Sequence, residues 1–245
     1  MGGHDGHASW SRIRSGPCRS RRSDVKLNLS ADEVLSTTRA VRKRLDFDKP
    51  VPLEVIHECL EYAIQAPTGS NAQGWQFVIV TDAEKRAKIG ELYRERFAAY
   101  RKMPVSAHAI AEGRSDADRA QQDRVIDSAE YLAENLAKAP VFLIPCITGR
   151  LDAGPGPMPN IMGASLYGSI IPAAWSFMLA ARERGLGTAW TTIHLMDEKI
   201  VADLLGIPFD EVTQIALIPV AYTKGTDFKP ARRLPLEQLV HVDRW

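Results

Sequence analysis

"APTGSNAQGWQFVIV", from Ala66 to Val80, decides how the surrounding chain folds. Ala66-Pro67 ends a predicted helix, because a residue before proline avoids the helical region, and Gln76–Val80 has the β-branched character of a buried strand. A plain connection needs only a turn, yet this one carries hydroxyls, two amides and an indole. Such groups can pair with the mixed donor and acceptor edge of a heterocycle, although an Asn can also satisfy its own turn. The segment therefore predicts either a ligand-binding turn or a self-satisfied one.

Similar signals place the other elements, and together they predict one α+β domain. Ser30-Ala31-Asp32-Glu33 reads as a capping box, in which the Ser and Glu side chains satisfy two free backbone donors at a helix start. A second box, Thr81-Asp82-Ala83-Glu84, opens a charged region with two predicted helices. Helices of unequal length between the strands favour a mixed layer structure over regular βαβ winding. The remaining expected elements are helices over 52–66, 161–184 and 197–205, and strands over 140–147, 188–192 and 212–222.

The composition is that of an ordinary globular protein. The chain has 245 residues, 45% of them hydrophobic, and a formal net charge of +1, so no global field favours nucleic acid or an anionic membrane. Its three cysteines form no CxxC pair, which fits neither a zinc site nor a disulfide framework. We find no apolar run as long as a membrane span and no secretory signal, and therefore expect a cytoplasmic protein without a membrane partner.

The first 24 residues differ from the rest of the chain. They mix Gly, Ser, His and Arg with few core-forming side chains, which predicts a disordered basic tail over 1–24 before a single domain over 25–245. The alternative is that the tail's arginines bind an acidic partner or nucleic acid. Trp10 is the single residue with a large aromatic side chain in the sequence of the tail, which is too few to favour nucleic-acid binding. The arginines concerned are Arg12, Arg14, Arg19, Arg21 and Arg22.

Basic residues gather near the end of the first predicted helix and again close to the C-terminus. One interpretation is a solvated basic face. The other is a phosphate clamp, because guanidinium groups make bidentate, charge-assisted bonds to phosphate oxygens. Two clusters that can converge on one phosphate strengthen the second interpretation. The clusters are Arg39, Arg42, Lys43 and Arg44, and Arg232 with Arg233.

Motifs of several common enzyme classes are absent from the sequence: no GxGxxG follows a strand, and there is no GxxxxGK[ST], HExxH or GxSxG. Five segments instead resemble, in order, the FMN-dependent nitroreductase family. They are Arg39-Ala40-Val41-Arg42, Val51-Pro52, "APTGSNAQGWQFVIVTD", "LAARERGLGTAWTT" and the Arg-Leu-Pro-Leu-Glu of the C-terminal arm, residues 229–245. The resemblance covers most of residues 30–245. It implies an α+β fold, a mixed sheet flanked by helices, in a homodimer whose subunits exchange arms and hold one FMN at each end of the interface.

The resemblance also assigns roles to residues. The arginines of the first motif, Arg39 and Arg42, bind the FMN phosphate, with Arg233 joining from the C-terminal arm. The turn over 67–71 reaches the flavin from the partner subunit, Gln73 lies near it, and the 190–192 segment faces the reactive edge of the ring. The residues expected at the cofactor are Arg39, Ala40, Val41, Arg42, Lys43, Pro67, Thr68, Gly69, Ser70, Asn71, Gln73, Trp190, Thr191, Thr192, Arg232 and Arg233.

The function implied by the resemblance is reduction of a small aromatic acceptor, a nitroaromatic or a quinone. NADH or NADPH passes hydride to flavin N5, leaves, and is replaced by the acceptor, which gives ping-pong kinetics. No side-chain acid or base is obvious, so no catalytic residue is predicted and the cofactor carries the chemistry. Dehalogenation, ene reduction and flavin cleavage are alternatives on the same fold. A flavin-binding protein without catalysis is the alternative from another class.

Overall fold

A computed structural model describes residues 26–112, 116–150 and 159–245, so the predicted tail over 1–24 lies outside the described residues. The fold is α+β, as predicted. Its sheet has the strand order β1-β6-β3-β2, with β4 paired to β6 and β5 paired to β3. All these strand pairs are antiparallel; in the described chain, parallel pairing occurs in two isolated bridges, Ala40 to Thr188 and Gly149 to Val212. The strands are β1 Leu45–Asp46, β2 Trp75–Val80, β3 Val141–Thr148, β4 Leu186–Thr188, β5 Val212–Gln214 and β6 Ile218–Thr223.

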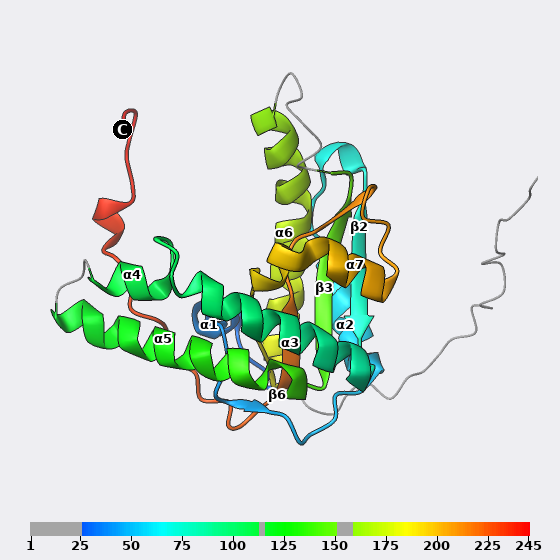
Figure 1. The fold of residues 1–245 in the computed structure, drawn as a ribbon. Coiled ribbons are helices and arrows are strands. Elements are labelled where there is room, and N and C mark those ends of the chain that lie inside the picture. The colour runs from blue at the N-terminus through cyan, green and yellow to red at the C-terminus, as the bar shows by residue number, and fades with distance from the viewer. Residues whose placement is uncertain (1–25, 113–115, 151–158) are drawn as a thin grey trace, which may run out of the picture.

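Helices cover both faces of the sheet (Figure 1). Because side chains alternate along a strand, β3 contributes Val141 and Leu143 to a core with α2 and α6, and Phe142, Ile144 and Cys146 to a core with α3 and α5. Burial on both faces explains why β3 is apolar without alternation. The helices are α1 Ala31–Thr37, α2 Leu53–Ala63, α3 Ala83–Tyr100, α4 Ala107–Glu112, α5 Asp116–Asn135, α6 Pro159–Glu183 and α7 Glu198–Leu205.

Local signals predicted the start of α1 correctly and the start of α3 to within one residue. The first capping box is present, since the Glu33 N–H donates to Ser30 Oγ at 3.3 Å and the Ser30 N–H donates to a Glu33 carboxylate oxygen at 2.8 Å. At the second expected box the N-cap is Asp82, not Thr81, because its carboxylate accepts the Lys85 N–H at 2.9 Å. Pro172 lies inside α6, which continues past it to Glu183.

Three other predictions are corrected. The basic cluster follows α1 instead of ending it, because the helix stops at Thr37 and the Val41 N–H bonds to the Thr188 carbonyl at the sheet. The third strand is β4, which overlaps the expected 188–192 segment only at Thr188. The expected strand over 212–222 is two strands, because Leu217 between them exchanges two backbone hydrogen bonds with Thr191 instead of pairing with β3. Between α3 and α5 the chain forms the extra helix α4.

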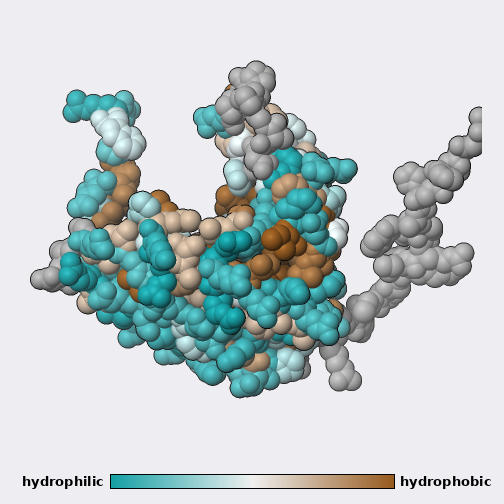
Figure 2. Space-filling model, in the orientation of Figure 1, coloured by the Kyte–Doolittle hydropathy of each residue, from teal (hydrophilic) through white to brown (hydrophobic). Residues whose placement is uncertain are grey.

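Two surfaces of this chain expose large apolar side chains. The C-terminal arm projects away from the body, and a hollow separates it from α6 (Figure 2). Asn160–Glu183 is long and apolar enough to span a membrane by length and composition, yet Ala173, Phe177 and Ala181 on it are fully buried in the core. The exposed apolar residues are Ile161, Met162, Tyr167, Ile171 and Trp175 on α6, and Leu234, Leu236, Leu239, Val240, Val242 and Trp245 on the arm.

Candidate functional site

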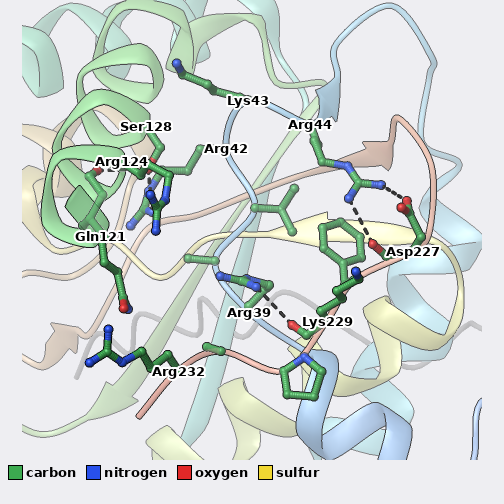
Figure 3. Close-up of a pocket in the computed structure, with 16 residues that line it drawn as sticks. Arg39, Arg42, Lys43, Arg44, Gln121, Arg124, Ser128, Asp227, Lys229 and Arg232 are labelled. Carbon is green, nitrogen blue, oxygen red and sulfur yellow. Dashed lines mark hydrogen bonds and ion pairs between the residues drawn. The ribbon is translucent and has the colours of Figure 1, made fainter. Parts of the chain in front are cut away.

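A cavity of about 540 Å³ lies where the basic segment after α1, helix α5 and the start of the C-terminal arm meet (Figure 3). Seven of its lining residues are cations and one is an acid, which makes the cavity an electropositive site. Five of the sixteen residues expected at the cofactor, residues 39–43, come together here from the segment after α1, and Arg232 joins them. The cations are Arg39, Arg42, Lys43, Arg44, Arg124, Lys229 and Arg232, and the acid is Asp227.

The basic segment is held by its apolar members. Val41 is 6% exposed and Leu45 is fully buried, so these two side chains hold the segment against the core while Arg39 and Arg42 reach the cavity. The Val41 N–H donates to the Thr188 carbonyl at 2.8 Å. Gly187 permits this approach, because a Cβ there would lie 2.7 Å from Thr223 Cγ2 and 3.0 Å from Val41 Cβ. Ala40 and Val41 therefore contribute through backbone and packing.

The four cations of this segment have different environments. Arg44 donates to Asp227 at 2.6 Å and stacks on the Phe228 ring, and Lys43 pairs with Asp127. Arg39 donates to the Lys229 carbonyl at 3.1 Å, and Arg42 donates to Ser128 Oγ at 3.3 Å. Burial lowers the pKa of the Arg42 guanidinium, partly opposed by nearby Tyr93 and Tyr100. Arg39 and Arg42 have no carboxylate partner among the described residues, so they are the members best placed to meet an added anion.

The C-terminal arm contributes one of its two expected arginines to this cavity. Arg232 lines the cavity and pairs with Asp118 at 3.1 Å. Arg233 does not line it; its guanidinium donates to the Arg232 carbonyl at 3.4 Å. Sequence reasoning missed Lys229 on the arm and the residues of α5 that face the cavity. The available signal for α5 was the helical spacing of Gln121, Arg124 and Ser128.

A second cavity of about 380 Å³ adjoins the first, and Arg42 lines both. Its wall is aromatic and apolar, and the three expected residues of the 190–192 segment belong to it. Thr191 is buried and donates to the Leu217 carbonyl at 2.7 Å, whereas Thr192 is exposed. Burial raises the pKa of Tyr93 to about 12, so this phenol stays neutral. The other lining residues are Phe97, Tyr100, Met103, Val105, Ala129, Trp190, Ile193 and Met196.

The turn over 67–73 lines neither cavity. It precedes β2, which lies at the opposite end of the strand order from β1, so one chain does not bring it to the basic cluster. Its backbone is unusual, because Ser70, Asn71 and Gln73 have φ of 52°, 52° and 50°, a region that costs a non-glycine residue about 1–2 kcal/mol. Gly69 N–H bonds to Ser169 Oγ at 3.1 Å, which docks the turn on α6. The side chains of Ser70, Asn71 and Gln73 are exposed, and Gln73 Nε2 donates to Asn71 Oδ1 at 3.2 Å within the turn.

Other reactive side chains lie away from the site. His194 is fully buried, and burial lowers its pKa to about 3; Gln214 partly opposes the shift, although neither ring nitrogen has a hydrogen-bond partner among the described residues. Burial raises the pKa of Cys59 and Cys146 to about 12, so both thiols are unreactive. No cluster of metal-ligating side chains occurs in the described parts of the chain.

The fold and the site together define an α+β protein with an antiparallel sheet between helices and a cationic cavity beside an aromatic one. Residues 35–222 match the sequence model of the nitroreductase family, and the chain belongs to that family. The chain is 30% identical over 159 residues to the 5,6-dimethylbenzimidazole synthase of Rhodospirillum rubrum, covering 65% of this chain and 67% of that protein.

Two solved structures share the fold. The FMN- and NADPH-dependent nitroreductase NfnB from Sphigopyxis sp. strain HMH has a TM-score of 0.62 at 21% identity, covering 89% of this chain and 100% of that chain. An iodotyrosine deiodinase, solved with FMN and 3-iodo-L-tyrosine, has a TM-score of 0.58 at 22% identity, covering 82% of this chain and 94% of that chain. These relatives carry out different chemistry on one fold, so the reaction has to be argued from the site of this chain.

Proposed function

We propose that this protein is an FMN-dependent oxidoreductase that uses NADH or NADPH to reduce nitroaromatic or quinone-type acceptors. The observation that carries the proposal is the pair of adjoining cavities that share Arg42, one cationic and one aromatic. FMN has the same division, with a phosphate at one end and a flat ring at the other. Their volumes of about 540 and 380 Å³ fall within the range of ordinary cofactor sites.

Each part of FMN has candidate partners in this chain. Arg39 and Arg42 are proposed to bind the phosphate, because neither has a carboxylate partner among the described residues that the phosphate would have to displace. Thr191, Thr192 and Trp190 are proposed to meet the ring at the edge of the aromatic cavity. FMN, when bound, supplies the two-electron chemistry that no protein side chain provides. The protein orients the ring and excludes water.

A second subunit completes the proposed flavin site. The turn over 67–73 is exposed and remote from both cavities, and the arm and α6 expose the apolar side chains named above. We propose that two chains exchange arms, covering these surfaces and bringing each turn to the partner's flavin. A chain ended at Arg233 should then run as a monomer in light scattering, while deletion of residues 1–24 leaves the dimer intact. A truncated chain that stays dimeric contradicts arm exchange.

The aromatic cavity indicates the class of acceptor. Arg42 is its only charged lining residue in the described chain, and the proposal commits that residue to the phosphate. A neutral flat acceptor fits such a wall, whereas a zwitterionic amino acid would leave its charges unpaired there. Because reductant and acceptor use the same cavity, they exclude one another, and initial-rate lines run parallel when both are varied.

The first test is a visible absorption spectrum of the purified protein before and after each nicotinamide is added. We expect a yellow protein that bleaches under nitrogen with NADH or NADPH and recovers its colour with a quinone or nitroaromatic. The relative bleaching rates also decide which nicotinamide is preferred. A colourless protein that cannot be reconstituted with FMN refutes the proposal, and intersecting initial-rate lines refute the shared cavity.

Product assays separate the alternatives on the same fold. The similarity to a deiodinase and to a 5,6-dimethylbenzimidazole synthase supports dehalogenation and flavin cleavage as second candidates. Iodide release from 3-iodo-L-tyrosine by the reduced protein, formation of 5,6-dimethylbenzimidazole, or reduction of an activated alkene would each replace the proposed reaction. Bound flavin that no acceptor reoxidises would indicate a protein that only binds flavin.

A further inference from the structure

We propose that helix α5 forms a third wall of the phosphate site and that Arg124 on this helix binds the phosphate. This inference rests on the proposed function, because it takes FMN as the ligand. Neither the sequence motifs nor the resemblance points to α5, whose residues lie some eighty positions beyond the first motif. The proposal follows from three observations: the face that α5 presents, the contacts that fix it there, and the charges left without partners.

One face of α5 lines the cationic cavity. Gln121, Arg124, Val125 and Ser128 all belong to the cavity wall, and their spacing of i, i+3, i+4 and i+7 puts them on one side of a helix. Figure 3 shows Arg124 and Ser128 beside Arg42, with Arg39 and Arg232 facing them across the cavity. The Ser128 hydroxyl donates to the Val125 carbonyl at 3.0 Å, which leaves its oxygen to accept from Arg42 at 3.3 Å. Ser128 therefore helps to position Arg42, and Arg124 lies one turn away.

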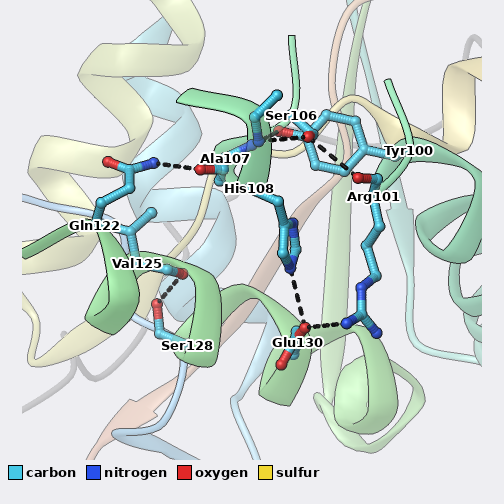
Figure 4. Close-up of polar contacts among 10 residues, drawn as sticks. Tyr100, Arg101, Ser106, Ala107, His108, Gln122, Val125, Ser128 and Glu130 are labelled. Carbon is cyan, nitrogen blue, oxygen red and sulfur yellow. Dashed lines mark hydrogen bonds and ion pairs between the residues drawn. The ribbon is translucent and has the colours of Figure 1, made fainter. Parts of the chain in front are cut away.

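Contacts on other sides of α5 hold this face toward the cavity (Figure 4). Gln122 donates to the Ala107 carbonyl of α4 at 3.1 Å. The Glu130 carboxylate pairs with Arg101, after α3, at 3.0 Å and lies 3.2 Å from His108 Nε2 on α4. These bonds join the helix to the two elements beside it at points two turns apart. The orientation of Arg124 is therefore a consequence of how α3, α4 and α5 pack.

The charges around the cavity leave room for an anion. Three of its seven cations have carboxylate partners: Arg44 with Asp227, Lys43 with Asp127, and Arg232 with Asp118. The other four have none within the described ranges, and they include Arg124, whose side chain is exposed at the cavity. A phosphate monoester carries about −1.5 to −2 charges near neutral pH. The four cations without a carboxylate partner among the described residues are Arg39, Arg42, Arg124 and Lys229.

Unpaired cations around one cavity repel each other, and a bound dianion removes that repulsion while gaining charge-assisted bonds. The benefit depends on the phosphate and is absent for riboflavin, which has the same ring without it. A contact between Arg124 and phosphate therefore changes the affinity for FMN and leaves that for riboflavin unchanged. A purely structural role of Arg124 affects both ligands equally.

The experiment measures binding of FMN and riboflavin to the full-length apoprotein by quenching of flavin fluorescence. We compare the wild type with Arg124→Ala, Arg124→Lys and the control Arg119→Ala. Arg119 is exposed on α5 but lies about 200° around the helix from Gln121, away from the cavity, and its removal changes the net charge equally. We expect Arg124→Ala to weaken FMN about tenfold and riboflavin less than twofold. Arg124→Lys should retain part of the FMN affinity, and Arg119→Ala should match the wild type.

The outcomes separate this inference from the proposed function. If the wild type binds neither flavin, the proposed function fails. If it binds FMN and Arg124→Ala binds as tightly as Arg119→Ala, the role of α5 is refuted while the function stands. Equal losses for FMN and riboflavin refute a phosphate contact. A loss seen only for NADPH binding to the FMN-loaded protein also overturns the inference, because Arg124 would then bind the dinucleotide phosphate.

Discussion

The buried His194 makes stability depend on pH in a way that can be calculated. Burial holds its folded-state pKa at about 3, against 6.5 for the ordinary group. Between these values the unfolded chain binds a proton that the folded chain does not, so the free energy of unfolding falls as pH falls. The limiting slope is about 1.4 kcal/mol per pH unit. From about pH 7.5 to about pH 4.5 this group alone lowers the free energy of unfolding by about 2.5 kcal/mol.

The perturbation that isolates this effect is His194→Gln. The substitution lowers stability at every pH, because it changes a fully buried side chain, but it also removes the titrating group. We therefore expect the slope of unfolding free energy against pH, between about pH 4.5 and about pH 6.5, to be shallower than in the wild type by about 1 kcal/mol per unit. In a chain of this size the wild-type loss corresponds to roughly 5–10 °C in melting temperature.

Urea unfolding followed by tryptophan fluorescence at several pH values measures the slopes. His57→Gln is the control, because it removes a histidine from the exposed surface of α2. The comparison uses differences in slope between variants, so the contributions of the other titrating groups to the slope cancel. Equal slopes for His194→Gln and the wild type would show that the imidazole is not held neutral by burial, and the reasoning from its environment would be wrong.

Three further predictions concern the elements that shape the site. Ser169→Ala removes the acceptor of the Gly69 N–H and should lower the unfolding free energy by about 1–2 kcal/mol in urea titrations; an unchanged midpoint argues against this bond. Ser70→Gly relieves a φ of 52° and should raise the melting temperature in calorimetry, whereas a decrease means that the side chain stabilises the turn. Gly187→Ala should weaken FMN binding and lower stability, because its Cβ meets Thr223 and Val41; Gly163→Ala, with open space, is the control, and equal effects contradict the packing argument.

Local chemistry explains which features were predictable. The capping box of Ser30 and Glu33 and the strand at Trp75–Val80 depend on residues within a few positions of each other, so their patterns are visible in the chain. The end of α1 was harder to predict from the sequence. The hydroxyls of Ser36, Thr37 and Thr38 bond back to carbonyls of the preceding turn, and the following segment joins the sheet instead of extending the helix.

The candidate site was only partly predictable for the same reason. Sequence reasoning found the basic cluster and the 190–192 segment, which the fold brings to adjoining cavities. It did not distinguish Lys43 and Arg44 from their neighbours, because their carboxylate partners lie 84 and 183 positions away. It also missed Arg124, since the face that a charged helix turns toward a cavity depends on what the helix packs against.

The amino-acid sequence by itself determined the α+β class, most of the helix and strand positions and the residue types available to hold a phosphate and a flat ring. These properties follow from hydrophobic periodicity, caps and motif order, which act over short distances along the chain. Only the tertiary structure decided that the turn and the basic cluster lie at opposite ends of the strand order, and which cations remain without carboxylate partners among the described residues. Those outcomes depend on how distant segments pair and pack against each other. Sequences with the same local patterns can differ in that pairing and packing.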